Sequence, residues 1–297
     1  MRFSDAAELL LLAAVWGGSF LFMRIAAPVL GPVWLIEIRV LLAGLLLLPL
    51  VMRLGLLREL RKHWVALLMV GCFNSALPFV LLAFASIALP VGFTAILNGT
   101  VPLFGMVVGA LWLKERLTGD RMAGFVIGFI GVVVLVGWQV TTATPAFWLA
   151  VSAGLLAALM YAISAPYIKQ TLAGVPPIAV TVGSQLSAAL LLLPAMPLTI
   201  PTQALAEGVS TDVILSILGL VVLSTAFAYI LYFRLIQNIG STRALTVAYL
   251  IPMFAILWGA LALGEAVTVS ILLGCGLVLV GTATANGLFR RMDGLKK

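Results

Sequence analysis

Three charged residues, Arg24, Glu37 and Arg39, lie inside long apolar stretches of this sequence. If those stretches cross a membrane, the charges are costly and are expected to pair, gate a pathway or contact a substrate. Arg24 and Glu37 both lie near the external ends of their stretches, so we predict an ion pair between them. Glu37 and Arg39 are two positions apart and face different ways on a helix. The alternative for these gating candidates is snorkelling to headgroups plus a structural ion pair.

Polar and aromatic residues near the middle of several apolar stretches form a second group. An amide, hydroxyl groups and several rings suit a zwitterion with an apolar side chain, because the polar groups replace hydration and the rings stack or offer cation–π contacts. For any single residue, helix–helix packing is at least as good an explanation. The candidates for the wall of a substrate cavity are Trp16, Asn74, Ser75, Phe79, Asn98, Tyr161, Tyr229, Tyr232 and Tyr249.

The remaining reactive side chains argue against an enzyme. The only histidine, His63, lies in a basic segment, and Cys72 and Cys275 lie in apolar runs without a partner base. No acidic cluster has the composition of a metal site, and no phosphate-binding loop is present. We therefore expect no catalytic residue, no metal and no cofactor.

The composition indicates a membrane protein. Of 297 residues, 63% are hydrophobic and 9% are charged, with a mean hydropathy of +1.23, whereas soluble domains carry about 25% charged residues. A net charge of +7 could indicate nucleic acid. The basic residues, however, form short clusters between apolar runs, as in cytoplasmic loops of membrane proteins. We expect a lipid bilayer and a small-molecule substrate as partners, no nucleic acid, and a monomeric chain.

The apolar pattern predicts an all-α polytopic protein. A span needs about 20 mostly apolar residues. Ten stretches qualify, at about 6–27, 33–52, 63–84, 91–113, 120–138, 146–168, 177–196, 212–236, 241–263 and 267–289.

The positions of Lys and Arg predict the orientation of these spans. With ten spans and a cytoplasmic N-terminus, 15 of the 17 basic residues fall on the cytoplasmic side. The four opposite loops contain none; they are 85–90, 139–145, 197–211 and 264–266. We expect a multi-pass protein of the bacterial inner membrane with both termini cytoplasmic.

An internal repeat divides the chain into two halves of five spans, residues 1–140 and 141–297. Residues 97–137 and 247–287 share 11 identities in 41 positions without a gap. An odd number of spans inverts the second copy, and inverted repeats around a central cavity are typical of secondary transporters. Pro102 and Pro252, which match each other, are candidate hinges because proline removes a helix hydrogen bond. The alternative is a static bend at each proline.

Each copy of the repeat also contains a glutamate followed three residues later by threonine, at Glu115 and at Glu265. Basic residues surround only Glu115, which marks that turn as cytoplasmic. The threonine is expected to cap the following helix, so this motif is interpreted as architecture.

The sequence resembles the EamA-type branch of the drug/metabolite transporter superfamily. The resemblance rests on WGGSFLFMR at 16–24, on Pro32 with Arg39 downstream, and on the twice-repeated P-x-F…G-A-L-x-L-x-E-x-x-T…G pattern. It implies a ten-helix transporter with a central cavity, in a family whose members include bacterial exporters of aromatic amino acids. We therefore expect an exporter of small metabolites, notably aromatic and apolar amino acids, that works by alternating access. Alternatives are an exporter of other small organic compounds or drugs, and a channel-like facilitator. The sequence leaves open whether export is proton-driven or facilitated.

Overall fold

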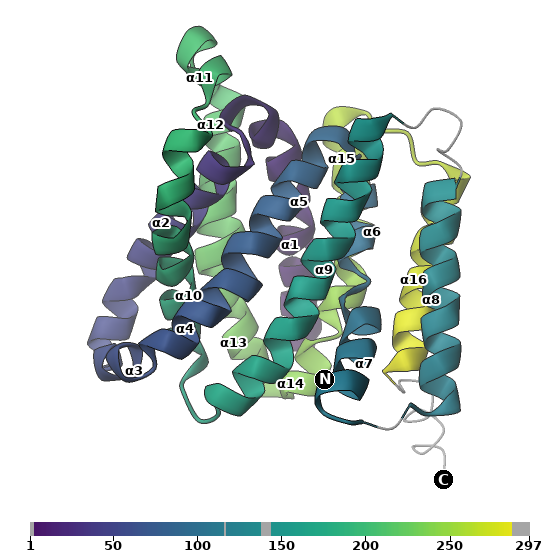
Figure 1. The fold of residues 1–297 in the computed structure, drawn as a ribbon, viewed down its shortest axis with the longest axis horizontal. Helices are drawn as coiled ribbons and strands as arrows, with labels where there is room; N and C mark the ends of the chain where they lie inside the picture. Colours follow the sequence, from purple (N-terminus) through teal and green to yellow (C-terminus); the bar gives the residue numbers. More distant parts are fainter. Residues whose placement is uncertain (1–2, 116, 138–143, 287–297) are drawn as a thin grey trace.

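The computed structural model describes residues 3–115, 117–137 and 144–286, and this part of the chain is helical without strands (Figure 1). Eight segments are long and apolar enough to cross a membrane. They are α1 (Phe3–Leu30), α2 (Pro32–Arg53), α4–η1–α5 (Trp64–Ala88), α6–α7 (Val91–Trp112), α8 (Gly119–Gly137), α9 (Pro145–Thr171), α10–η2 (Pro177–Leu198) and α12–η3–α13 (Thr211–Ile239).

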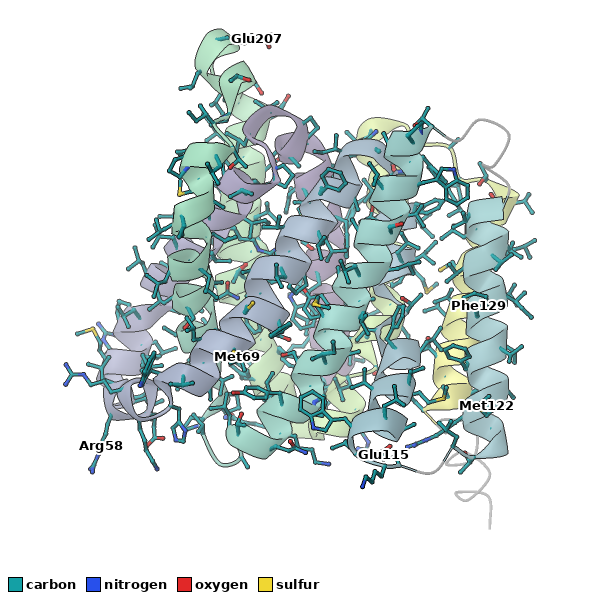
Figure 2. The ribbon with its side chains drawn as sticks, in the orientation of Figure 1. Arg58, Met69, Glu115, Met122, Phe129 and Glu207 are labelled. Carbon is teal, nitrogen blue, oxygen red and sulfur yellow. The ribbon has the colours of Figure 1, made fainter. Side chains whose placement is uncertain are left out.

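Two further apolar helices are shorter, with 17 residues each: α15 (Val247–Leu263) and α16 (Val269–Ala285). The expected ends of spans five and ten, 138 and 287–289, lie outside the described residues. Three short helices, α3 (Leu57–Lys62), α11 (Thr202–Glu207) and α14 (Ser241–Ala244), connect the longer ones. Large apolar side chains such as Met122 and Phe129 are exposed on the outside of the bundle (Figure 2), as lipid contact requires. The chain is an integral membrane protein.

Helices from the two halves of the chain pack in matching pairs. The α1 helix packs against α15 and against the α12–η3–α13 segment, while α9 packs against α6–α7 and against α5. The α2 helix packs on α10, and α8 packs on α16. Figure 1 shows α8 and α16 side by side at one edge of the bundle. The packing of α1 on the second half of the chain thus has a counterpart in the packing of α9 on the first half.

Glycines allow the closest of these approaches. A Cβ atom at Gly281 of α16 would collide with the backbone of Gly128 and Gly124 in α8. A Cβ atom at Gly17 of α1 would likewise collide with Phe254 and Ala255 of α15. Small residues that let helix backbones meet are the usual basis of packing in membranes, because no hydrophobic effect drives helices together there.

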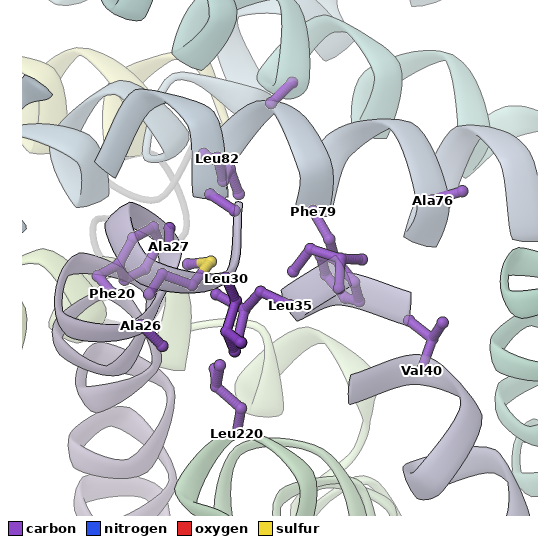
Figure 3. Packing of buried hydrophobic residues seen from close by; sticks show 14 of the residues in the cluster. Phe20, Ala26, Ala27, Leu30, Leu35, Val40, Ala76, Phe79, Leu82 and Leu220 are labelled. Atoms are coloured by element: carbon purple, nitrogen blue, oxygen red, sulfur yellow. The ribbon is translucent and has the colours of Figure 1, made fainter. Parts of the chain in front are cut away.

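The largest apolar cluster lies between α1, α2 and α5. Phe20, Leu35, Phe79, Leu82 and Leu220 meet there with almost no exposed surface (Figure 3). This cluster holds the first half of the chain against η3 of the second half.

Two segments widen from α-helix to π-helix: η1 (Gly71–Ala76) and η3 (Gly219–Phe227). Each lies in the third apolar segment of its half. π-helical turns are rare and occur often at functional sites. Here they contain Asn74 and Ser224, which are 150 residues apart.

Two of the apolar segments are interrupted. Residues 99–100 separate α6 (Val91–Asn98) from α7 (Val101–Trp112), and residues 245–246 separate α14 from α15. The expectation that Pro102 removes a hydrogen bond inside a helix is wrong. Pro102 lies in the first turn of α7, where even a residue with a backbone N–H would find no acceptor within the helix. Pro252 does lie inside α15.

Candidate functional site

A central cavity of about 680 Å³ lies between the two halves of the chain. Its wall is mostly apolar and aromatic, with a few polar groups, which is the usual composition of a small-molecule site. Leu245 and Asn286 line the cavity and are exposed. The cavity therefore reaches the surface at the end of the bundle that carries α14.

Matched positions of the two halves contribute to the cavity wall. Asn74 and Ser224 line it from the π-helical segments, and Phe79 and Tyr229 line it one turn further on. Pro102 and Pro252 line it from the interrupted segments, and Trp16 and Tyr161 from α1 and α9. The members of the first three pairs are 150 residues apart, and those of the last pair 145.

The structure brings most of the candidate cavity residues together. Seven of the nine line the central cavity: Trp16, Asn74, Phe79, Asn98, Tyr161, Tyr229 and Tyr249. Ser75 is fully buried outside the wall, and Tyr232 lies behind Trp16 with ring centroids 5.2 Å apart. The Oδ1 atom of Asn98 is buried without a hydrogen-bond donor among the described residues.

Arg39 lies in the cavity wall, and sequence reasoning placed it only among the gating candidates. Its Nε donates to Thr225 Oγ1 of η3 over 3.1 Å, and its guanidinium lies 4.0 Å above the centre of the Phe79 ring. With 5% of its surface exposed, Arg39 does not snorkel to headgroups. The missed signal was the depth of Arg39 in its span, about two helical turns from the start of α2.

The predicted ion pair between Arg24 and Glu37 is wrong. Arg24 pairs instead with Glu265, which lies between α15 and α16, over 3.6 Å from Nε to Oε1. Arg24 Nη1 also donates to the carbonyl oxygens of Ser86 and Ile87 in the last turn of α5. The depth of the two residues in the membrane suggested the pair, but the faces of α1 and α2 on which they lie do not bring them together.

Glu265 contacts the beginning of the next helix as well. Its Oε2 accepts a hydrogen bond from the Val91 amide, at the N-terminus of α6, over 2.9 Å. Arg24 and Glu265 therefore bracket the turn between α5 and α6. Arg24, a cation, contacts carbonyl groups at the C-terminus of α5, and Glu265, an anion, contacts an amide at the N-terminus of α6. Helix dipoles favour a cation and an anion at these respective ends. We call Arg24, Glu265 and the Val91 amide the clasp.

The matching glutamate of the first half makes a different contact. Glu115 pairs with Arg121 of the following helix over 2.8 Å, and both side chains are exposed. Both glutamates have the same local backbone, since each amide donates to the carbonyl of the glycine six residues earlier, Gly109 or Gly259. The two glutamates differ in their side-chain partners. Glu265 contacts Arg24 and the Val91 amide of the first half, whereas Glu115 contacts Arg121 of the following helix.

The predicted capping by threonine is confirmed in the second copy, where Thr268 Oγ1 accepts from the Ile271 amide over 3.3 Å. Cys72 and Cys275 are free cysteines in this structure. Glu37, by contrast, is 2% exposed, and neither of its carboxylate oxygens has a hydrogen-bond partner among the described residues. Glu37 does not line the central cavity.

Comparison with solved structures supports the fold. The chain superposes on a crystal structure of another protein with a TM-score of 0.67 and 21% sequence identity. The match covers 99% of this chain and 100% of the other. At this identity the likeness establishes a shared fold.

Several curated proteins are similar over nearly their whole length. An uncharacterised transporter of Archaeoglobus fulgidus is 25% identical over 92% of this chain and 95% of its own. A probable amino-acid metabolite efflux pump of Salmonella typhimurium is 26% identical over 95% of this chain and 94% of its own. A probable terminal-alkyne amino-acid exporter of Streptantibioticus cattleyicolor is 23% identical over 96% of this chain and 95% of its own.

The family profile matches the chain twice. The EamA-like transporter family matches residues 6–137 and again residues 148–287. Together these ranges span most of the sequence and include the helices that line the central cavity. The chain belongs to the EamA-like transporter family, in the EamA-type branch of the drug/metabolite transporter superfamily, and is a membrane transporter and not an enzyme.

Proposed function

We propose that this protein exports amino acids, including aromatic and apolar ones, by alternating access in a bacterial inner membrane. The observation that carries the proposal is the central cavity. Its volume of about 680 Å³ falls in the usual range for small-molecule sites. Rings suited to an apolar side chain surround it, and Asn98 contributes an amide group to its wall. The names of the Salmonella and Streptantibioticus relatives support amino acids as the substrate class.

We further propose ten spans in two inverted repeats, residues 1–140 and 141–297. The matched helix pairs and the matched cavity residues support this arrangement. With α14 and its connection, the ninth segment covers 241–263, which is long enough to cross a bilayer. The 17 residues of α16 extend about 25 Å at 1.5 Å per residue, so we expect the bilayer to thin slightly there.

The distribution of charge supports cytoplasmic termini. Arg58 and Glu115, with its partner Arg121, lie at one end of the bundle, while Glu207 lies at the other (Figure 2). The end with Arg58 carries the basic loops and is the cytoplasmic side by the positive-inside rule. The clasp then lies on the external side.

The difference between the two glutamate turns supports the proposal of alternating access. The clasp joins α1, the α5–α6 turn and the α15–α16 turn on the external side, while the cavity reaches the surface at the opposite end. This arrangement is the inward-open state. In the outward-open state, Glu115 would leave Arg121 and contact the N-terminus of α14, which is the counterpart of the N-terminus of α6. Lys169, which matches Arg24 in the second half of the chain, would take the place of Arg24. Inverted repeats exchange such contacts between the two sides.

Counterflow in proteoliposomes tests the proposed transport. Vesicles containing the purified full-length protein and L-phenylalanine inside should take up external labelled L-phenylalanine, and the initial rate should saturate. A channel-like facilitator would give no counterflow, and failure to move any amino acid tried would overturn the substrate class. Repeating the assay with and without a proton gradient separates proton-driven from facilitated export.

A further inference from the structure

The central cavity contains one charged side chain in its described wall, the guanidinium of Arg39. Arg39 forms no ion pair with another described residue, whereas Arg24, Arg121 and Arg234 pair with Glu265, Glu115 and Glu8. A buried charge without a partner is costly, and more so within a membrane. An arginine in this position therefore needs a compensating anion at some stage of the transport cycle.

The guanidinium is held so that one edge is free. The Phe79 ring covers one face of the group, and Thr225 Oγ1 accepts a hydrogen bond from Nε. Thr225 is itself fixed, because its hydroxyl donates to the Leu220 carbonyl within η3 over 2.8 Å. The two Nη atoms make no hydrogen bond to another described residue. Together they form the fork that binds a carboxylate through two parallel hydrogen bonds.

Among the described residues, no acidic side chain lines the cavity beside Arg39. Glu37 is two residues away on the same helix, so its side chain faces a different way, and it does not line the cavity. The rest of the wall offers neutral groups such as Asn74, Asn98 and Tyr161. The counter-ion must come from outside the described chain.

We infer that Arg39 is the anchor for a carboxylate group of the transported molecule. The inference deepens the proposed function and rests on it. A single arginine surrounded by rings matches one carboxylate on a molecule with an apolar body. Compounds that lack the carboxylate leave the guanidinium unpaired, and cationic compounds add repulsion. The cavity thus selects for an acid and against the corresponding amide or amine.

Equilibrium binding to the full-length protein in lipid nanodiscs tests this anchor. The probes are L-phenylalanine, 3-phenylpropanoate, L-phenylalaninamide and 2-phenylethylamine, measured by calorimetry. The wild type should bind the two carboxylates about 10- to 100-fold more tightly than the amide or the amine, as expected for a charge-assisted pair. Arg39→Gln should abolish this preference, and Arg39→Lys should keep part of it. Arg234→Gln removes an exposed arginine that pairs with Glu8 and should leave the preference unchanged.

The outcomes separate the anchor from the transport function. Equal affinity of the wild type for L-phenylalanine and L-phenylalaninamide overturns the anchor, whether or not the Arg39 variants fold. Loss of acid preference in Arg234→Gln as well as in Arg39→Gln also overturns it. If 3-phenylpropanoate binds through Arg39 while no amino acid gives counterflow, the anchor stands and the amino-acid proposal fails. If neither carboxylate binds, the anchor is overturned, and counterflow with other amino acids then decides the proposed function.

Discussion

Arg24 and Glu265 are 241 residues apart and meet across the bundle, with 3.6 Å between Nε and Oε1. Each also contacts the turn between α5 and α6, Arg24 through the Ser86 and Ile87 carbonyls and Glu265 through the Val91 amide. The pair by itself contributes little where it is partly exposed. Its importance lies in joining three segments on one side of the membrane while the matching glutamate, Glu115, does not join their counterparts.

Removing the clasp glutamate should open the external end. In Glu265→Ala the Val91 amide loses its acceptor and Arg24 loses its ion-pair partner, which weakens closure by about 1–2 kcal/mol. A cysteine placed at Ser86, which is 1% exposed, should then react about 5- to 30-fold faster with a membrane-impermeant maleimide. Glu115→Ala in the same background is the matched control and should not accelerate labelling. Equal acceleration in both variants would contradict the asymmetry of the two turns.

Neutralising Glu37 should not harm the protein. Both carboxylate oxygens are buried without a hydrogen-bond partner among the described residues, so Glu37→Gln removes no hydrogen bond of the described structure and lowers the cost of burial. The thermal midpoint in detergent should stay the same or rise, and counterflow should continue. Glu59→Gln, at an exposed helix, is the control and should shift the midpoint little. A clear loss of counterflow in Glu37→Gln alone would show that Glu37 has a role in transport.

A methyl group between α8 and α16 should destabilise the bundle. Gly281→Ala forces a Cβ atom against the Gly124 and Gly128 backbone, at a cost of about 1–3 kcal/mol and several degrees in Tm. Gly276→Ala lies on the same helix with no atom within 4 Å of the new Cβ and should be neutral or slightly stabilising. Equal melting temperatures for the two variants would show that the helices separate easily.

Asn98 should matter for binding and not for stability. Its buried Oδ1 has no donor among the described residues, so Asn98→Ala removes no internal hydrogen bond made by that atom. The affinity for L-phenylalanine should fall about tenfold if the amide accepts from the ammonium group. Ser75→Ala, a buried residue outside the cavity wall, should leave affinity unchanged. A lower melting temperature of Asn98→Ala with unchanged affinity would indicate a structural role instead.

Much of the candidate site was predictable because its residues are polar or aromatic at mid-span, where lipid contact disfavours polar groups. Trp16, Asn74 and Tyr161 are examples, and all three line the cavity. Ser75 and Tyr232 share the same signal and lie outside the wall. Which face of a helix meets the cavity depends on the neighbouring helices, so composition and depth do not distinguish wall residues from those behind them.

The sequence by itself determined the membrane class, the repeat and the family resemblance, because each depends on local hydropathy or on residue spacing along the chain. The tertiary structure decided which charges meet. Arg24 was expected to pair with Glu37, its close neighbour in sequence and depth, and it pairs with Glu265 instead. Arg39 lies in the wall of the cavity, against Phe79 and Thr225. The reason is geometric: spacing sets the height of a side chain along its helix, while the packing of α1 on α5 and α15, and of α2 on η3, sets the direction it faces.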